Sequence, residues 1–306
     1  MKSMIRRRFI KNASLTMAGF FLGYPAFTRK DHNPHFSFST LGCPTWSLTE
    51  VINFATKYQY DAIEIRGIQG ELDITKCPDF SNTEKISSTR KKVEDRHLKI
   101  ICLDSSARLS YADEKKKKNN LDEIRKLIDI AQQLNCPYVR AMPDTISEGQ
   151  EYDATVDLII NGLTDLAEYA KGSKVSVILE SHGDFVGTES LLHIMKNSES
   201  PHVGLIWDIS NMWSAKKEPP ALVYEKLKKY IRHTHFCDFK YIGNKYHSVL
   251  MGQGEAPVSE AVKALKKGNY DGYYGFEWEK LWEPDIEDPE IAFPQFIHEM
   301  KIYLKR

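Results

Sequence analysis

The chain has 306 residues and a formal net charge of zero, because 42 lysines and arginines balance 42 aspartates and glutamates. A protein that binds duplex nucleic acid normally carries a basic excess, so this balance argues against nucleic acid as the main partner. The five cysteines show no C-x-x-C spacing, which argues against a disulfide scaffold or a zinc ribbon. Hydrophobic residues make up 42% of the chain, enough for a large core.

Residues 1–35 differ in character from the rest of the chain. Arg6, Arg7 and Arg8 precede an apolar stretch over 13–27 that is rich in Ala, Gly, Leu and Phe. A charged start before a short apolar run is typical of an export signal, and the run Arg-Arg-x-Phe-Ile-Lys resembles the twin-arginine signal. We therefore predict an export signal and linker over 1–35 and a periplasmic protein, or a membrane-tethered one if the signal stays uncleaved. The alternative is a basic amphipathic helix.

From residue 36 onward, strand-like and helical patterns alternate. Strands are expected at 36–41, 62–65, 99–103, 138–141, 175–179, 203–207, 231–236 and 273–276. Helices are expected at 50–58, 84–97, 121–134, 154–170, 189–195, 221–230, 258–267 and 289–305. Eight such units without a break in composition predict an α/β fold with a parallel sheet, a single-domain (β/α)8 TIM barrel over 36–306. An open doubly wound sheet is the alternative.

Four residues with side chains that can bind a metal lie at the ends of four consecutive predicted strands. In chain order they are Glu180, Asp208, His235 and Glu277. The carboxyl ends of barrel strands share one rim, and three carboxylates there repel one another unless a cation neutralises them. Oxygen ligands with one imidazole suit Mn²⁺, our first choice, and also Mg²⁺, Co²⁺ or Zn²⁺. The alternative for each acid alone is a loop cap or an ion-pair partner.

Three further side chains lie near this predicted rim. His233 precedes His235 by two residues on one strand, and we expect a hydrogen-bonded core histidine there rather than a deeper neighbour of the ligands. Trp46 and Trp213 are the tryptophans that we favour for stacking against a sugar ring. Ordinary packing is the alternative for both tryptophans.

A long polar segment separates the seventh and eighth predicted strands. It contains Lys240, Lys245 and His247, with glycines at 243, 252 and 254. Phosphate sites use a glycine-rich turn, a helix N-terminus or clustered cations. The two lysines of this segment are scattered and do not form such a cluster. We therefore expect an unphosphorylated substrate, with this segment as a mobile lid over it.

Four segments together resemble the xylose-isomerase-like barrel superfamily. They are Ile-Leu-Glu180-Ser-His182-Gly, Trp-Asp208-Ile-Ser-Asn211, His233-Thr-His235-Phe-Cys-Asp238 and Gly-Phe-Glu277-Trp. The similar branch is that of the sugar phosphate isomerases and epimerases, which includes ketose 3-epimerases, hydroxypyruvate isomerases and inosose dehydratases. The resemblance extends over 36–306.

This resemblance implies a role for individual residues. It implies that the four strand-end residues are the metal ligands and that Glu180 and Glu277 also serve as catalytic acid and base. The substrate-binding residues that we predict are Glu64, Arg140, His182, Asn211, Asp238, Lys240, His247, Trp46 and Trp213. Two positions depart from the family pattern: Cys237 replaces a lysine, and Asn211 stands where many relatives have a histidine. The identity of the sugar therefore stays open.

The predicted reaction is proton transfer at the carbon next to a carbonyl. A divalent cation chelated by the substrate oxygens stabilises the enediolate that forms, while one glutamate removes the proton and a second returns it. Epimerisation, isomerisation and dehydration share this first step. The expected substrate is a small carbohydrate, either a free or glycosidic keto-sugar or an inosose. A homo-oligomer is a further option for the assembly. The alternatives are an endonuclease IV-like hydrolase, a lyase, or a non-catalytic carbohydrate-binding barrel.

Overall fold

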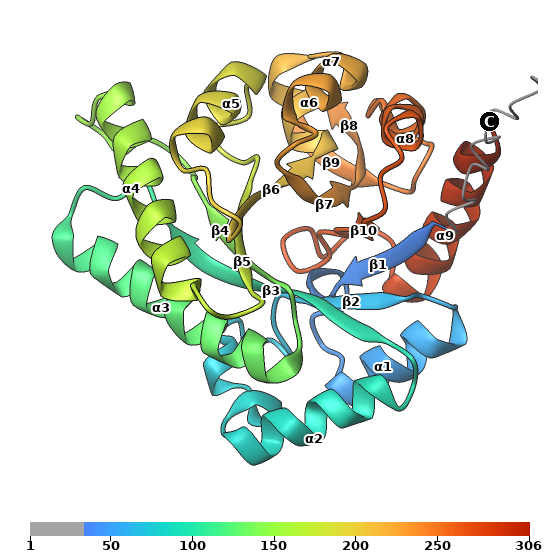
Figure 1. Cartoon of the computed structure of the whole chain (residues 1–306). Helices are drawn as coiled ribbons and strands as arrows, with labels where there is room; N and C mark the ends of the chain where they lie inside the picture. The colour runs from blue at the N-terminus through green and yellow to red at the C-terminus, as the bar shows by residue number, and fades with distance from the viewer. Residues whose placement is uncertain (1–33) are drawn as a thin grey trace, which may run out of the picture. The chain divides into compact units, whose positions relative to one another are not determined.

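The computed structural model describes residues 34–306, and here the predicted strand–helix units close into a barrel (Figure 1). Its eight strands are all paired in parallel, in the order β1-β10-β7-β6-β5-β4-β3-β2. They are β1 (His35–Ser39), β2 (Ala62–Ile65), β3 (Lys99–Arg108), β4 (Tyr138–Met142), β5 (Ser176–Glu180), β6 (Val203–Asp208), β7 (Ile231–Phe236) and β10 (Tyr273–Phe276). The (β/α)8 prediction is confirmed, and the open sheet is wrong. The predicted export signal falls on residues outside the described ones, except at its end.

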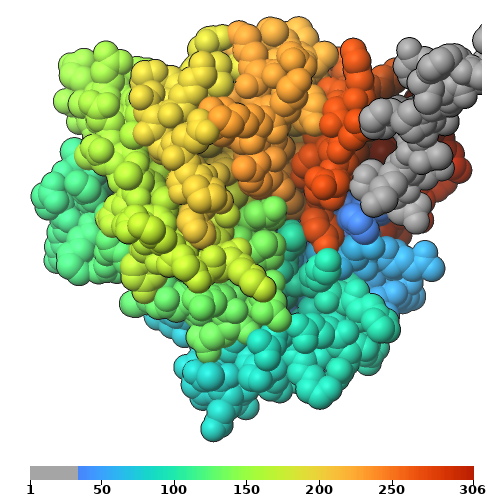
Figure 2. All heavy atoms as spheres, viewed as in Figure 1, coloured from blue at the N-terminus to red at the C-terminus, as the bar shows by residue number. Residues whose placement is uncertain are grey.

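Helices surround this barrel (Figure 1). They are α1 (Leu48–Lys57), α2 (Thr83–Glu94), α3 (Glu114–Leu134), α4 (Tyr152–Ala170), α5 (Thr188–Asn197), α6 (Ile209–Lys216), α7 (Pro220–Leu227), α8 (Val258–Lys267) and α9 (Pro289–Lys305). Neighbouring helices pack side by side, as the cyan and green residues of α2 and α3 do at the lower edge of Figure 2. Among residues 34–306, no helix combines the length and apolar character needed to cross a bilayer.

Two features of the structure differ from the sequence-based expectation. The segment predicted as a mobile polar loop begins with a hairpin of β8 (Asp238–Ile242) and β9 (Lys245–Val249), paired antiparallel. Its two-residue connection is Gly243-Asn244, with φ +64° at Gly243, a known signal for a tight hairpin. The helix α6 was also missed, because its apolar residues show little helical periodicity. Asp208 caps its N-terminus, since its side chain accepts a hydrogen bond from the Asn211 amide.

Alternation along the strands places apolar and polar residues in successive layers inside the barrel. A small buried cluster contains Ala62, Ile101, Cys102, Ile178 and Ile206. The residues two positions further along four of these strands are Glu64, Asp104, Glu180 and Asp208. Because side chains repeat every second residue on a strand, these acids point to the same side as the apolar cluster and lie nearer the carboxyl ends. The barrel therefore has an apolar floor beneath a charged layer.

Candidate active site

The carboxyl end of the barrel gathers the four predicted ligands. Glu180 ends β5, Asp208 ends β6 beside His235 of β7, and Glu277 follows β10. One side-chain atom from each lies within 4.8 Å of the others, and all four residues are buried. The structure thus brings the four together into one compact group of three carboxylates and one imidazole.

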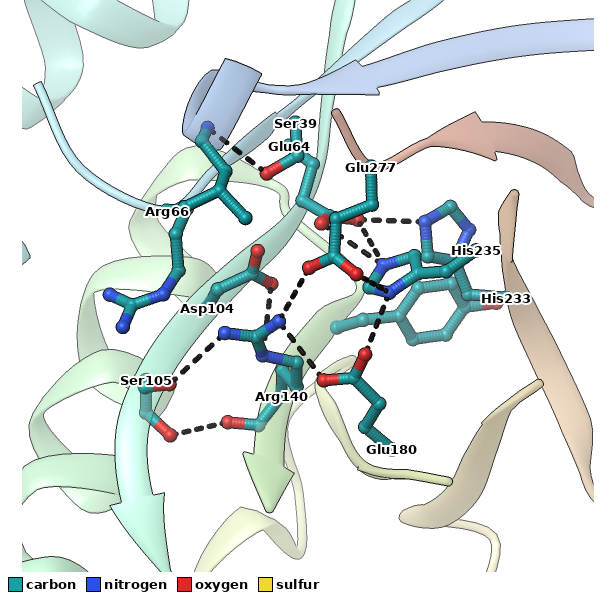
Figure 3. Close-up of polar contacts among 12 residues, drawn as sticks. Ser39, Glu64, Arg66, Asp104, Ser105, Arg140, Glu180, His233, His235 and Glu277 are labelled. Atoms are coloured by element: carbon teal, nitrogen blue, oxygen red, sulfur yellow. Dashed lines mark hydrogen bonds and ion pairs between the residues drawn. The ribbon is translucent and has the colours of Figure 1, made fainter. Parts of the chain in front are cut away.

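The side chains of Arg140 and His235 bridge the glutamates of this group (Figure 3). Nη1 of Arg140 lies 3.0 Å from Glu180 Oε2 and 3.0 Å from Glu277 Oε1. Nδ1 of His235 lies 3.0 Å from the remaining oxygen of each glutamate. Burial alone would raise the pKa of Glu180, but the nearby charges of Arg140 and His235 outweigh it and lower this pKa to about 2.

A second carboxylate holds the other side of the imidazole. Nε2 of His235 lies 3.1 Å from Glu64 Oε1, and Nε2 of His233 lies 2.8 Å from Glu64 Oε2. His233 is fully buried, so it is a core histidine that pairs with Glu64. A carboxylate on one imidazole nitrogen fixes the ring and leaves the other nitrogen to face the ligand group. Glu64 therefore orients His235, with Nδ1 toward Glu180 and Glu277.

Within the part of the chain that the structure describes, residues 34–306, Asp208 has no positive partner comparable to Arg140. Burial, followed by the charges of Glu180 and Glu277, raises the pKa of Asp208 to about 8. Three carboxylates at this spacing repel one another, and a divalent cation among them would relieve that repulsion. The donor set of three carboxylates and one imidazole fits such a cation.

A cavity of about 370 Å³ opens above this group. That volume lies in the range of roughly 300–1,000 Å³ that small-molecule sites occupy. Its lining residues are Leu41, Arg66, Leu72, Ser106, Arg108, Arg140, Met142, Glu180, His182, Asn211, Glu277, Glu279 and Trp282. Five predicted site residues are among them: Arg140, Glu180, His182, Asn211 and Glu277. Asp208, His235 and Glu64 lie in the layer of charged side chains that includes Glu180 and Glu277.

Asp144 is a further acid beside this cavity that the sequence analysis did not single out. Its Oδ2 lies 2.5 Å from Arg108 Nη1, and its Oδ1 lies 3.6 Å from His182 Nδ1. Burial would lower the pKa of His182, but the pairing with Asp144 and the charge of Glu180 raise it to about 9. His182 therefore faces the cavity as a cation.

Five other predicted site residues lie away from the lining. Trp46 packs on Phe54, with ring centroids 4.8 Å apart, and Trp213 lies under the ammonium of Lys217. Lys240 is exposed on the hairpin, and His247 Nδ1 lies 2.9 Å from Glu283 Oε2. The fifth, Asp238, accepts hydrogen bonds from backbone amides of the segment that follows the hairpin. The tryptophan in the cavity wall is instead Trp282, which the sequence pattern did not distinguish from the others.

Asp238 anchors the chain that follows the hairpin. Its carboxylate accepts hydrogen bonds from the backbone amides of Phe239, Gly252, Gly254 and Ala256, at 2.8–3.0 Å. A buried carboxylate that accepts several amides organises a loop, and removing it leaves those amides unpaired. These contacts give Asp238 a structural role in this segment.

We expect Asp238→Ala to lower the free energy of unfolding by about 3 kcal/mol, because several charge-assisted hydrogen bonds are lost at once. For a domain of this size the melting temperature should fall by about 6–12 °C, measured by thermal unfolding. Asp157→Ala, at an exposed position of α4, is the control and should change little. An unchanged melting temperature for Asp238→Ala would show that the amides find other partners.

Glu279 is the acidic cavity residue that sequence reasoning missed. It lies two residues after Glu277, and this spacing was the signal that could have found it. Burial, followed by the charges of Glu277 and Asp208, raises the pKa of Glu279 to about 8. The tryptophan between the two glutamates, Trp278, is fully buried and stacks on Phe276 instead.

The sequence of this barrel matches a known family. The family model of the xylose isomerase-like TIM barrel matches residues 52–293. The chain therefore belongs to the xylose isomerase-like TIM barrel family. Within it, the chain is 24% identical to an inosose isomerase of Halalkalibacterium halodurans, over 78% of this chain and 84% of that protein. It is 26% identical to a fructoselysine 3-epimerase of Shigella flexneri, over 64% and 71%.

Solved structures share the fold at lower identity. An L-ribulose 3-epimerase superposes with a TM-score of 0.73 and 14% identity, covering 89% of this chain and 95% of that one. The IOLI protein, solved with a bound zinc atom, superposes with a TM-score of 0.71 and 18% identity, covering 89% and 95%. These similarities support the barrel fold.

Proposed function

We propose that this protein is a divalent-metal-dependent sugar isomerase or epimerase that moves a proton at the carbon next to a carbonyl. The observation that carries the proposal is the convergence of Glu180, Asp208, His235 and Glu277 beneath a cavity of small-molecule size. The family relatives named as an inosose isomerase and a fructoselysine 3-epimerase support this reaction class.

In this proposal, Glu180, Asp208, His235 and Glu277 hold one cation, with Mn²⁺ as the first choice. Once bound, such a cation supplies a Lewis acid that polarises the substrate carbonyl and neutralises charge developing on its oxygen. Glu64 keeps the His235 ring in place, since it pairs with the nitrogen that faces away from Glu180 and Glu277.

The two glutamates are placed for proton transfer. β5 and β10 lie three places apart around the barrel, so Glu180 and Glu277 approach the cavity from different sides. Arg140 contacts one oxygen of each and so keeps their orientations fixed. One glutamate can then take the proton from one face of the substrate while the other returns a proton to the opposite face, which gives epimerisation. Return to the adjacent carbon gives isomerisation.

The test is a substrate screen in deuterated water with Mn²⁺-loaded protein. Free ketoses, keto-glycosides and inososes are incubated separately, and deuterium is located in the recovered sugars by NMR. We expect deuterium at the carbon next to the carbonyl of the turned-over sugar, because the removed proton exchanges with solvent. Product formation without deuterium would contradict the proposal and favour hydride transfer or hydrolysis.

We also propose that the protein is exported through the twin-arginine route, on the sequence signal Arg-Arg-x-Phe-Ile-Lys alone. Replacing Arg6 and Arg7 together by lysine should keep the charge but remove the pair, so the protein should accumulate in the cytoplasm. Cell fractionation and immunoblotting measure this, with Lys2→Arg as the control. Unchanged periplasmic accumulation of the double variant would contradict the route.

A further inference from the structure

Arg66 is a buried cation in the wall of the candidate cavity. It follows β2, two residues after Glu64, so the strand alternation directs both side chains toward the barrel interior. The backbone amide of Arg66 donates to Thr40 Oγ1 at 2.9 Å, which fixes the start of the side chain. Only 6% of the residue is exposed, and it lines the same cavity as Glu180 and Glu277.

The charge of Arg66 has no carboxylate partner within residues 34–306, in contrast to the other two arginines of the cavity. Arg140 pairs with Glu180 and Glu277, and Arg108 pairs with Asp144. Arg66 donates from Nη2 to Ser106 Oγ at 3.0 Å, while its Nη1 is buried with no hydrogen-bond partner. In Figure 3 the Arg66 guanidinium is joined to none of the carboxylates drawn. Buried charges are normally paired, because an unpaired one loses its hydration without compensation. Arg66 is an exception to this rule, and it lies in the wall of the cavity where a ligand would bind.

We infer that the substrate is an acid and that Arg66 binds its carboxylate. This inference rests on the proposed function and adds the class of substrate. A guanidinium presents its N–H groups in a planar fork that matches a carboxylate. Nη1 of Arg66 has no hydrogen-bond partner to give up, so a rotation of the guanidinium toward the cavity would present it to one carboxylate oxygen. The Ser106 hydroxyl beside it lines the cavity and can donate to the other oxygen.

The neighbouring charges favour a carboxylate over a phosphate. A phosphate dianion needs clustered cations or the free amides of a glycine-rich turn, whereas Arg108, Arg140 and His182 are already paired with acids of this chain. Glu180 and Glu277 mark the reacting end of the cavity. The substrate class is therefore a keto-sugar acid, with its carbonyl near the glutamates and its carboxylate at Arg66.

The experiment compares ligands that differ only at one carbon. Isothermal titration calorimetry measures the binding of fructose, fructuronate and fructose 6-phosphate, and of the corresponding tagatose set, to the Mn²⁺-loaded protein. We expect an acid to bind at least tenfold more tightly than its parent ketose, which corresponds to about 1.4 kcal/mol. In Arg66→Met the ratio should fall to near one. In Arg96→Met, at an exposed arginine of the same chain, the ratio should be kept.

Three outcomes overturn the inference: no acid binds to wild type, the acid and the ketose bind equally, or the preference survives Arg66→Met. Tighter binding of a 6-phosphate than of its uronate would also overturn the assignment to a carboxylate. If Arg66→Met does not fold, Arg66→Lys keeps the charge without the fork, and its ratio should fall below that of wild type. Deuterium exchange by wild type tests the reaction separately, so a failure of the acid preference is distinguishable from a failure of the proposed function.

Discussion

Mn²⁺ should raise the melting temperature of the wild-type protein, and Asp208→Asn should lose most of that increase. A cation that binds only the folded state at one hundred times its dissociation constant adds about 2.7 kcal/mol, or about 5–10 °C for a domain of this size. Asp208 is the chosen position because its carboxylate lies among the donor atoms and lacks a strong cationic partner. Asparagine can still cap α6, so the change removes charge from the site while keeping the helix start.

The measurement is a pair of thermal unfolding curves for each variant, with and without Mn²⁺, together with metal analysis of the dialysed protein. Asp157→Asn, at an exposed position of α4, is the matched control and should keep the full increase. We expect about one cation per chain in wild type and clearly less in Asp208→Asn. A wild-type curve that does not move with Mn²⁺ or Co²⁺, with no metal in the protein, would contradict the metal site.

Glu277→Gln and Glu180→Gln should each reduce the rate of deuterium exchange into the turned-over sugar by about 10²–10⁴-fold, the usual contribution of a general acid or base. Glutamine keeps the size and one oxygen of glutamate but cannot accept the proton. Both side chains contact Arg140 and His235, so each substitution also weakens a buried ion pair, and a thermal unfolding curve of each variant checks that the fold is kept.

Initial exchange rates at saturating Mn²⁺ measure this effect, and metal analysis of each variant separates lost chemistry from lost metal. Glu84→Gln, exposed in the first turn of α2, is the control. Full activity in either active-site variant would exclude that glutamate as an acid or base. A normal rate of exchange with one product epimer missing would instead assign that glutamate to the return of the proton.

Much of the fold and the convergence of the four candidate ligands could be predicted from the chain alone. The eight apolar runs separated by helical patterns reflect local alternation, and such local order survives in the folded barrel. Glu180, Asp208 and His235 were found because each stands at the carboxyl end of a strand, and parallel strands bring those ends to one rim. Glu277 was found in the same way. For these four, position along the chain determines position in space.

Tertiary structure alone decided which tryptophan lines the cavity and which charges are paired. Trp46 and Trp213 look like Trp282 in sequence, yet only Trp282 lines the cavity, because the direction of each ring depends on the helix or loop that carries it. Arg66, Arg108 and Arg140 are equally charged in sequence. Which of them has a counter-ion depends on carboxylates from distant strands, such as Glu277, which is 137 residues from Arg140. Pairing of charges is a property of three-dimensional neighbours, so the unpaired cation at Arg66 appears only in the folded chain.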